Sequence, residues 1–212
     1  MKLNTNSNSY IIIYSAILVI IVAFLLAFVY QALKPMQDAN VELDKKKQIL
    51  NSLNIRGLGD AEADATYKKL LTRVDSIGEG KARKPYIYYF KIEGKDKYVF
   101  PMKGMGLWGG ISGYVALNDD KNTVYGAYFD HDSETAGLGA EIKDSQEWQE
   151  KFQGKKVFDD QGKVAIGVEK KVEESNKAYE VDAVTGATLT SNGVRDMLRA
   201  SFKEYETFLK QK

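Results

Sequence analysis

Two residue types that commonly build metal and redox sites are scarce in this sequence. The 212 residues include no cysteine and one histidine, His131. Without thiols, the chain can form no disulfide, no iron–sulfur cluster on its own residues and no thiolate zinc site. One histidine cannot form a multi-histidine metal site, and we predict no metal ligands. A covalently attached cofactor would have to use a hydroxyl group or His131.

The sequence also lacks a net charge of any size. It carries 30 Lys and Arg residues against 29 Asp and Glu residues. Lys2 is the one charged residue in the segment 1–33, so the remainder holds 29 basic and 29 acidic residues and has a net charge of zero. No basic surface is implied, and nucleic acid is not an expected partner.

A long apolar run without charged residues occupies residues 10–33. A helix of this length spans about 36 Å, enough to cross a hydrocarbon core of roughly 30 Å. Tyr10, Tyr14 and Tyr30 lie near its ends, as interfacial aromatic residues do. The run is too long for the apolar part of a signal peptide, and no Ala-x-Ala-like cleavage site follows it. We therefore predict a single transmembrane helix in a lipid bilayer.

The lysines around this run bear on its orientation. Lys2 precedes it, whereas Lys34, Lys45, Lys46 and Lys47 follow it. The positive-inside rule, taken literally, would leave the C-terminal domain in the cytoplasm.

The chain as a whole is expected to have four segments. They are a short polar tail at 1–9, the membrane helix at 10–33, a helical stalk or linker at 34–84 and a folded domain at 85–212. Within the stalk, apolar spacing predicts helices over 41–53 and 61–77, separated by Gly57-Leu58-Gly59, and a loop over 78–84.

Residues 85–212 combine aromatic and β-branched runs with turn signals. Strands are expected at 86–92, 98–100, 114–117, 123–129, 164–168 and 178–181, with hairpin turns at 94–97 and 118–122. Helices are expected over 145–152 and along the C-terminal segment. Hairpins with flanking helices predict an α+β domain with a mostly antiparallel sheet.

The stretch from Asp182 to Ser191 is the strongest candidate site. Its hydroxyl residues are Thr185, Thr188, Thr190 and Ser191, and Gly186 and Ala187 lie among them. They stand where a strand gives way to a helix, and free N–H groups and the positive end of the helix dipole favour an anion such as phosphate there. An ordinary capped helix without a ligand would have the same local composition.

Two glycine-containing patches could also contact a ligand. In Gly104–Gly110, four glycines surround Leu107 and Trp108, which predicts either a backbone that packs against a flat ring or a flexible loop whose Trp108 fills the core. In His131–Glu141, polar residues accompany Gly137 and Gly139 after a strand, where loops often carry sites. A solvated acidic loop is the alternative, and we assign His131 no catalytic role.

These three stretches together resemble a known family. Asp182-x-x-Thr185-Gly186-Ala187-Thr188 is similar to the signature of proteins that carry covalently bound FMN. Gly106-Leu107-Trp108 and His131-x-x-Glu134-Thr135-x-Gly137-Leu138-Gly139 resemble blocks of the C subunit of the sodium-translocating NADH:quinone oxidoreductase. Ala136 departs from the pattern, since the family usually has proline there.

The resemblance implies a role for each candidate residue. Thr188 would be joined to the FMN phosphate by a phosphoester, with Thr185, Gly186, Ala187 and Thr190 around that phosphate. Glu134, Thr135, Leu138 and Gly139 would approach the ribityl chain or the ring. Leu107 and Trp108 would lie near the isoalloxazine.

The resemblance also implies a location and partners. The family is a single-pass electron carrier of the bacterial inner membrane, its flavin domain lies on the periplasmic side, and it works among other redox and membrane subunits. The orientation is opposite to the one that the lysines favour. The G subunit of the related ferredoxin-linked complex, a tethered structural module without flavin, and a module that binds its ligand reversibly are the alternatives.

Overall fold

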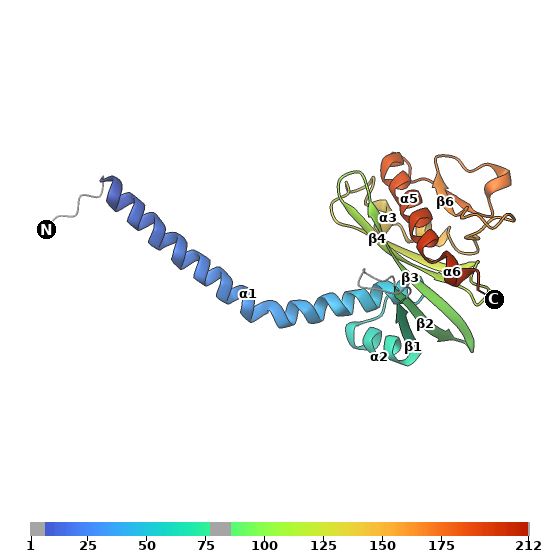
Figure 1. The fold of residues 1–212 in the computed structure, drawn as a ribbon, viewed down its shortest axis with the longest axis horizontal. Helices are drawn as coiled ribbons and strands as arrows, with labels where there is room; N and C mark the ends of the chain where they lie inside the picture. Colours follow the sequence, from blue (N-terminus) through green and yellow to red (C-terminus); the bar gives the residue numbers. More distant parts are fainter. Residues whose placement is uncertain (1–6, 77–85, 212) are drawn as a thin grey trace. The chain divides into compact units, whose positions relative to one another are not determined.

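The computed structural model describes residues 7–76 and 86–211 (Figure 1). Contacts between residues divide the chain into two compact units. The first ends at Asp44 and the second begins at Lys45. Residues 1–6 of the expected tail over 1–9, the whole loop expected over 78–84, and residues 77, 85 and 212 lie outside the described residues.

The first unit consists of most of helix α1, which runs from Asn8 to Ser52 and includes Pro35. The apolar residues 10–33 lie within this helix and their side chains are exposed, as those of a lipid-facing helix would be. By length and composition α1 can cross a membrane, with a mean hydropathy of 3.1 in its most apolar window. The separate helix expected over 41–53 is therefore the continuation of one helix.

The second unit is an α+β domain built on a five-stranded antiparallel sheet, which confirms the expected fold class. The strands are β1 (Leu71–Ser76), β2 (Tyr86–Ile92), β3 (Lys95–Met105), β4 (Gly110–Leu117) and β5 (Val124–His131), in that order across the sheet. Glu93 and Gly94 both have positive φ and close the β2–β3 hairpin, where glycine and a twisted two-residue turn fit. The sheet is thus a simple meander.

The two faces of the sheet are covered by different helices. On one face, Phe100 and Val115 lie in register and pack with Phe202 of helix α5 (Thr188–Glu204) and with Tyr205, which follows it. On the other face, Phe90 of β2 contacts Tyr67 of helix α2 (Asp60–Leu70) edge to face. Both faces are therefore buried, and β3 and β4 form the centre of the domain.

The outer edge of β5 is covered by the end of α1 and the residues after it. The side chain of Asn54 donates to the Tyr125 carbonyl (2.7 Å), and that of Arg56 donates to the Ala127 carbonyl (3.0 Å). A Cβ on Gly126 would lie 2.5 Å from the Ser52 carbonyl oxygen, so the chain passes very close to the strand. These contacts satisfy carbonyls that an edge strand would otherwise leave open.

Several expected elements were wrong in their bounds or type. The helix expected over 61–77 ends at Leu70, and residues 71–76 form β1, which pairs with β2 and so belongs to the sheet. The pair expected over 164–168 and 178–181 is found as β6 (Gly167–Glu169) and β7 (Glu180–Asp182), and it is parallel.

The helix expected over 145–152 is shorter than predicted, and one short helix precedes it. The two are α3 (Glu141–Asp144) and α4 (Gln146–Glu150), and both contact β5. A 3-10 turn, η1 (Glu174–Asn176), lies between β6 and β7, and helix α6 (Glu206–Leu209) follows α5. Helices α3 and α4 thus lie against the edge strand β5, whereas α6 follows the C-terminal end of α5.

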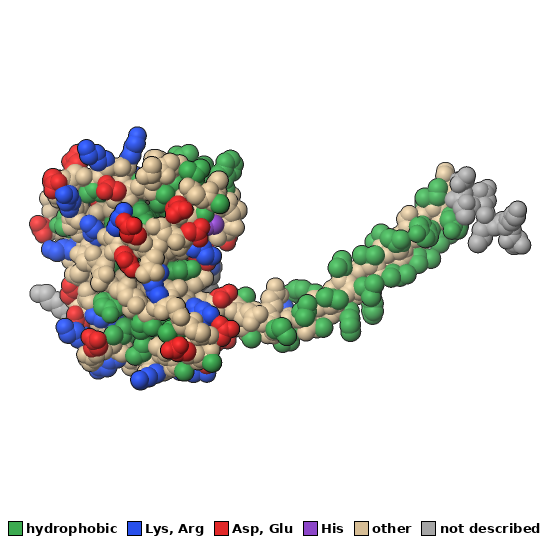
Figure 2. Space-filling view, turned by 180° about the vertical axis from the view of Figure 1, so that it is seen from behind, with side chains coloured by type: hydrophobic (Ala, Val, Ile, Leu, Met, Phe, Trp, Pro, Cys, Tyr) green, Lys and Arg blue, Asp and Glu red, His purple; other side chains and the backbone are tan. Residues whose placement is uncertain are grey.

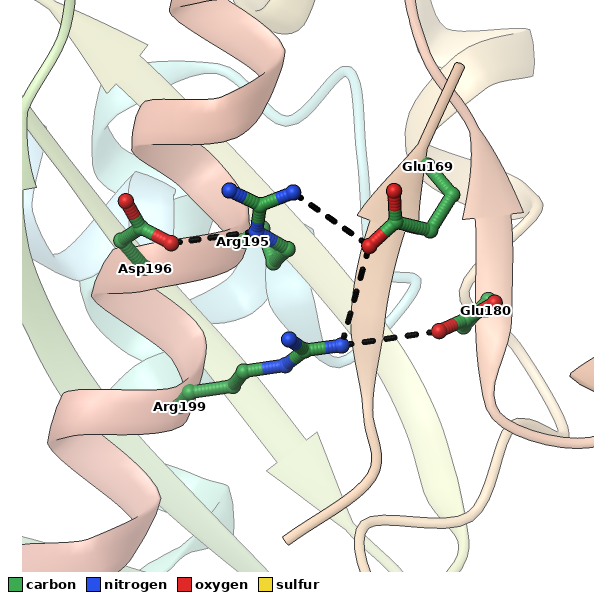
Figure 3. Close-up of polar contacts among 5 residues, drawn as sticks. All are labelled: Glu169, Glu180, Arg195, Asp196 and Arg199. Atoms are coloured by element: carbon green, nitrogen blue, oxygen red, sulfur yellow. Dashed lines mark hydrogen bonds and ion pairs between the residues drawn. The ribbon is translucent and has the colours of Figure 1, made fainter. Parts of the chain in front are cut away.

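An ionic cluster fixes α5 beside the β6–β7 pair (Figure 3). Arg195 contacts Glu169 at 3.3 Å, and Arg199 contacts Glu180 at 3.5 Å. Gly167 lies directly opposite, because a Cβ there would be 3.0 Å from the Arg199 guanidinium. The short strands and the helix that follows them are therefore held as one piece.

Candidate functional site

The candidate site is centred on the connection from β7 to α5. Residues 183–187 form a turn in which Gly186 has a φ of +77°, a conformation that glycine adopts without strain. The Ala187 N–H donates to the Val184 carbonyl (3.0 Å), which closes the turn. Thr188 is then the first residue of α5, as the sequence pattern predicted for a helix start.

The four hydroxyl residues of this stretch differ sharply in burial. Thr190 is 1% exposed and donates to the Glu134 carboxylate at 2.6 Å. Ser191 is fully buried, and its Oγ accepts the Val184 N–H at 3.1 Å. Thr185 and Thr188 are exposed. Only these last two of the four can be reached by a large molecule from solvent.

The start of α5 offers backbone donors next to the exposed hydroxyls. The Ser191 N–H donates a hydrogen bond to the carbonyl of Ala187, the residue just before the helix (2.9 Å). Helix geometry gives the N–H groups of Thr188, Leu189 and Thr190 no carbonyl one turn earlier within the helix. Together with the helix dipole, these donors suit the oxygens of a phosphate.

Glu134 joins this helix start to the loop between β3 and β4. Residues 106–109 form a tight turn, closed by a bond from the Gly106 N–H to the Gly109 carbonyl (2.8 Å). The N–H groups of Trp108 (2.8 Å) and Gly109 (3.3 Å) donate to Oε1 of Glu134. Its Oε2 accepts from Thr190, so one carboxylate connects two segments that are far apart in the sequence.

The charge of Glu134 is stabilised by these donors. Burial raises the pKa of its carboxyl group, because the ionised form loses hydration. The hydrogen bonds from Thr190 and from the N–H groups of the 106–109 turn act in the opposite direction and outweigh burial, so the pKa lies below its ordinary value. Glu134 is therefore ionised at neutral pH.

Several glycines are required by close contacts around this carboxylate. A Cβ on Gly106 would lie 2.5 Å from Oε1 of Glu134, and a Cβ on Gly139 would lie 2.5 Å from Oε2. On the helix side, a Cβ on Gly193 would lie 2.3 Å from the Met105 carbonyl oxygen. Gly106 and Gly139 thus leave room for the Glu134 side chain, and Gly193 lets α5 pack against the backbone of Met105 and Gly106, which explains why this region is rich in glycine.

Large apolar side chains stand exposed at the start of α5 and in the two loops that contact it. They are Met105, Leu107, Trp108, Leu138 and Leu189, and each is at least 43% exposed. Figure 2 shows hydrophobic side chains gathered at one end of this domain, near the single histidine. Trp108, at 67% exposure, does not fill the core, so that alternative is wrong. An apolar surface beside N–H groups that can bind a phosphate suits a ligand with a flat ring and a phosphate group, such as FMN.

The structure brings together the residues that the sequence singled out. Leu138 lies over Gly186, since a Cβ there would be 2.9 Å from its Cδ2. Thr135 is exposed, and its carbonyl accepts the N–H groups of Leu138 (3.1 Å) and Ala140 (3.0 Å), which gives the loop its shape without a proline at position 136. Met105 and Leu189 were not predicted, although both adjoin predicted residues in the sequence.

Part of this chain matches a described protein family. The model of the FMN-binding domain matches residues 106–203, a segment that holds the 106–109 turn, the 131–139 loop and the start of α5. All the side chains of the candidate site except Met105 fall within it.

The curated relatives agree in name. The C subunit of the Na(+)-translocating NADH-quinone reductase of Haemophilus ducreyi is 30% identical over 238 residues, covering 95% of this chain and 92% of that protein. The protein of the same name from Neisseria meningitidis is 41% identical over 134 residues, which cover 61% of this chain but only about half, 51%, of the relative.

A solved structure extends the likeness to the fold. The crystal structure of the C subunit of the Na(+)-translocating NADH-quinone reductase from Parabacteroides distasonis shares 34% sequence identity with this chain and a TM-score of 0.78. The match covers 85% of this chain and 98% of that one.

Proposed function

The chain belongs to the C-subunit family of the Na(+)-translocating NADH-quinone reductases, and from this premise we propose that it is a membrane-anchored flavoprotein subunit that relays electrons through a covalently bound FMN. The matched FMN-binding domain supports the cofactor. Helix α1 supports the membrane anchor, because it is long and apolar enough to span a bilayer. The names of the relatives support partners that are other subunits of a quinone-reducing complex.

The observation that carries this proposal is the exposed hydroxyl of Thr188 at the start of α5. Four hydroxyl groups lie close together there, and Thr190 and Ser191 are buried and hydrogen-bonded. Of the two exposed threonines, Thr188 is the one at the helix start, where N–H donors stabilise phosphate oxygens. We propose Thr188 as the residue that forms the phosphoester.

The surrounding residues have distinct roles in this proposal. Thr185 and the backbone of Gly186 and Ala187 would steady the phosphate, while the bare backbone of Gly186 gives room to the Leu138 side chain. Leu138 and Thr135 would hold the ribityl chain. Leu107 and Trp108 form an apolar wall that shields one side of the ring from water.

FMN supplies one- and two-electron redox chemistry when bound, and the residues of this chain fix its position, solvent access and electrostatic surroundings. The side chains of Thr190 and Glu134 are hydrogen-bonded to each other, so they support the site without binding the cofactor. This is a relay function. The isolated protein is expected to hold flavin without completing a catalytic cycle alone.

The proposed location is the bacterial inner membrane, with the domain that begins at Lys45 on the periplasmic side. The likeness to the family supports the periplasmic side, whereas the lysines on either side of the membrane helix favour the cytoplasm. A reporter fused to the C-terminus that is active only in the cytoplasm should stay inactive. An active reporter would reverse the orientation without affecting the flavin site.

The test of the cofactor is in-gel flavin fluorescence of denatured protein made in a host that has the flavin-attaching enzyme. The parent band should fluoresce and the Thr188→Val band should be dark, because valine keeps the shape but removes the hydroxyl group. Thr185→Ser, which keeps the hydroxyl group at the other exposed threonine, is the matched control and should fluoresce. Fluorescence in the Thr188→Val band would refute the assigned residue.

A parent band without fluorescence would contradict covalent attachment, and the colour of the native protein would then separate the two alternatives. Yellow native protein that loses its colour on denaturation would indicate reversible ligand binding, and colourless native protein would indicate a tethered module without flavin.

A further inference from the structure

We propose that Glu134 is a positioning residue, a buried carboxylate that fixes the 106–109 turn against the start of α5 and so holds Leu107 and Trp108 beside Thr188. In this role it does not contact the flavin. The inference rests on the proposed function, because it assigns a task to a residue that the family resemblance placed against the cofactor.

The first argument is that both carboxylate oxygens are already used inside the protein. Oε1 accepts the N–H groups of Trp108 and Gly109, and Oε2 accepts the Thr190 hydroxyl. Glu134 is 7% exposed, so little of it remains for a ligand. A carboxylate satisfied by three donors would also repel the negative phosphate if it faced it directly.

The second argument is the position of its partners. Thr190 lies two residues after Thr188 on the first turn of α5, and Trp108 is the exposed aromatic residue of the 106–109 turn. Glu134 therefore connects the attachment residue's own helix turn with the apolar wall. The 2.6 Å bond to Thr190 is short, as bonds to ionised acceptors are.

The third argument is steric. Gly106 and Gly139 approach opposite oxygens of the carboxylate so closely that neither position tolerates a Cβ without movement. Glu134 is itself fixed at the backbone, because its N–H donates to Nδ1 of His131 at 3.2 Å. The turn, the loop and the helix start thus share one centre.

The consequence concerns the mobility of the flavin relative to its wall. If Glu134 positions the 106–109 turn, breaking its bonds leaves the phosphoester on Thr188 intact and frees the ring from Leu107 and Trp108. The covalent yield should therefore be unchanged while the ring becomes more mobile. A residue with only a general structural role would lower the stability without changing the motion of the ring.

The experiment uses the full chain in detergent, made with the flavin-attaching enzyme. The variants are Thr190→Val, which removes one hydroxyl at nearly constant shape, and Glu134→Ala, which removes the centre. Thr190→Ser keeps the hydroxyl group and is the matched control. The readouts are in-gel flavin fluorescence, the polarisation anisotropy of the bound flavin, and amide hydrogen exchange of the peptide that spans 106–109.

We expect parental in-gel fluorescence in all variants. Anisotropy should fall in Glu134→Ala and Thr190→Val and stay at the parental value in Thr190→Ser. Exchange of the 106–109 peptide in Glu134→Ala should be about tenfold faster or more, the factor that corresponds to losing hydrogen bonds to a charged acceptor.

Parental anisotropy in both Glu134→Ala and Thr190→Val would overturn the inference. If Glu134→Ala fails to fold, Thr190→Val decides the question by itself. A parent without covalent flavin would refute the proposed function instead, and hydrogen exchange would still test the link between Glu134 and the 106–109 turn.

Discussion

Gly193→Ala should destabilise the domain, although alanine is the better helix former. Gly193 lies inside α5, one turn after Leu189, where glycine is disfavoured by about 1 kcal/mol relative to alanine. Helix propensity alone therefore predicts that the substitution stabilises the protein by about that amount. The environment of the residue predicts the opposite.

The opposing effect is a collision with backbone. The new Cβ would lie 2.3 Å from the carbonyl oxygen of Met105 and 3.2 Å from Cα of Gly106. Met105 is held in register with Gly110 at the end of the β3–β4 ladder, so its carbonyl cannot rotate away like a flexible side chain. Overpacking of this kind costs about 1–3 kcal/mol, and more when backbone must move.

The balance is a net loss of about 1–2 kcal/mol, since an upper-range overpacking cost of about 2–3 kcal/mol minus the helix gain of about 1 kcal/mol leaves that difference. For a domain of this size each kcal/mol lowers the melting temperature by about 2–4 °C, so we expect a decrease of about 2–8 °C. The assay is thermal unfolding of the full chain in detergent, followed by circular dichroism.

Asn192→Ala is the matched control at the neighbouring position of the same helix. It should be neutral or stabilising by about 0.5 kcal/mol, because only helix propensity changes. If Gly193→Ala raised the melting temperature as much as this control, the close packing of α5 on the end of β3 would be wrong.

Three further outcomes follow from named contacts. Glu169→Gln weakens the contact with Arg195 and should lower stability by about 0.5–1 kcal/mol in urea unfolding, with a smaller effect at high salt. Tyr205→Phe removes a buried hydroxyl that bonds two backbone carbonyls at 3.2 Å and should lower stability by about 1 kcal/mol, measured in the same way. The pKa of Glu134 is lower in the folded state than its ordinary value of 4.5. The ionised carboxylate therefore stabilises the fold at pH values above 4.5, and this stabilisation is lost as the pH falls through the folded-state pKa. The stability gap between the parent and Glu134→Gln should therefore narrow below pH 4.5, and a gap that is constant down to pH 2 would contradict the lowered pKa.

Much of the sheet could be predicted because its signals are local. The aromatic and β-branched run at 86–92, the turn at Gly94 and the polar turn after Leu117 each specify a strand or a hairpin within a few residues. Residues 71–76 lacked such a signal. Leu70, Leu71 and Val74 fit a helical period, and the segment is a strand because it pairs with β2, a contact that local spacing cannot reveal.

The candidate site was predictable in its location but not in its internal organisation. The sequence showed four hydroxyl groups at a helix start, yet only burial separates the exposed Thr185 and Thr188 from the buried Thr190 and Ser191. The bond between Thr190 and Glu134 spans 56 positions. The parallel pairing of β6 with β7 was equally hard to predict, because a strand of three residues has no sequence pattern that distinguishes parallel from antiparallel pairing.

The covered edge of β5 sets a limit on how this protein can be made soluble. Asn54 and Arg56 donate side-chain hydrogen bonds to that strand, and Ile49 and Leu50 of the last turns of α1 are buried in the domain. A version shortened to start at α2 would remove the membrane helix and also expose an unpaired strand edge and an apolar surface. Such an edge is a template for other strands. Starting the chain at Lys45, where the second unit begins, should instead keep this edge and surface covered and leave the protein less prone to aggregation.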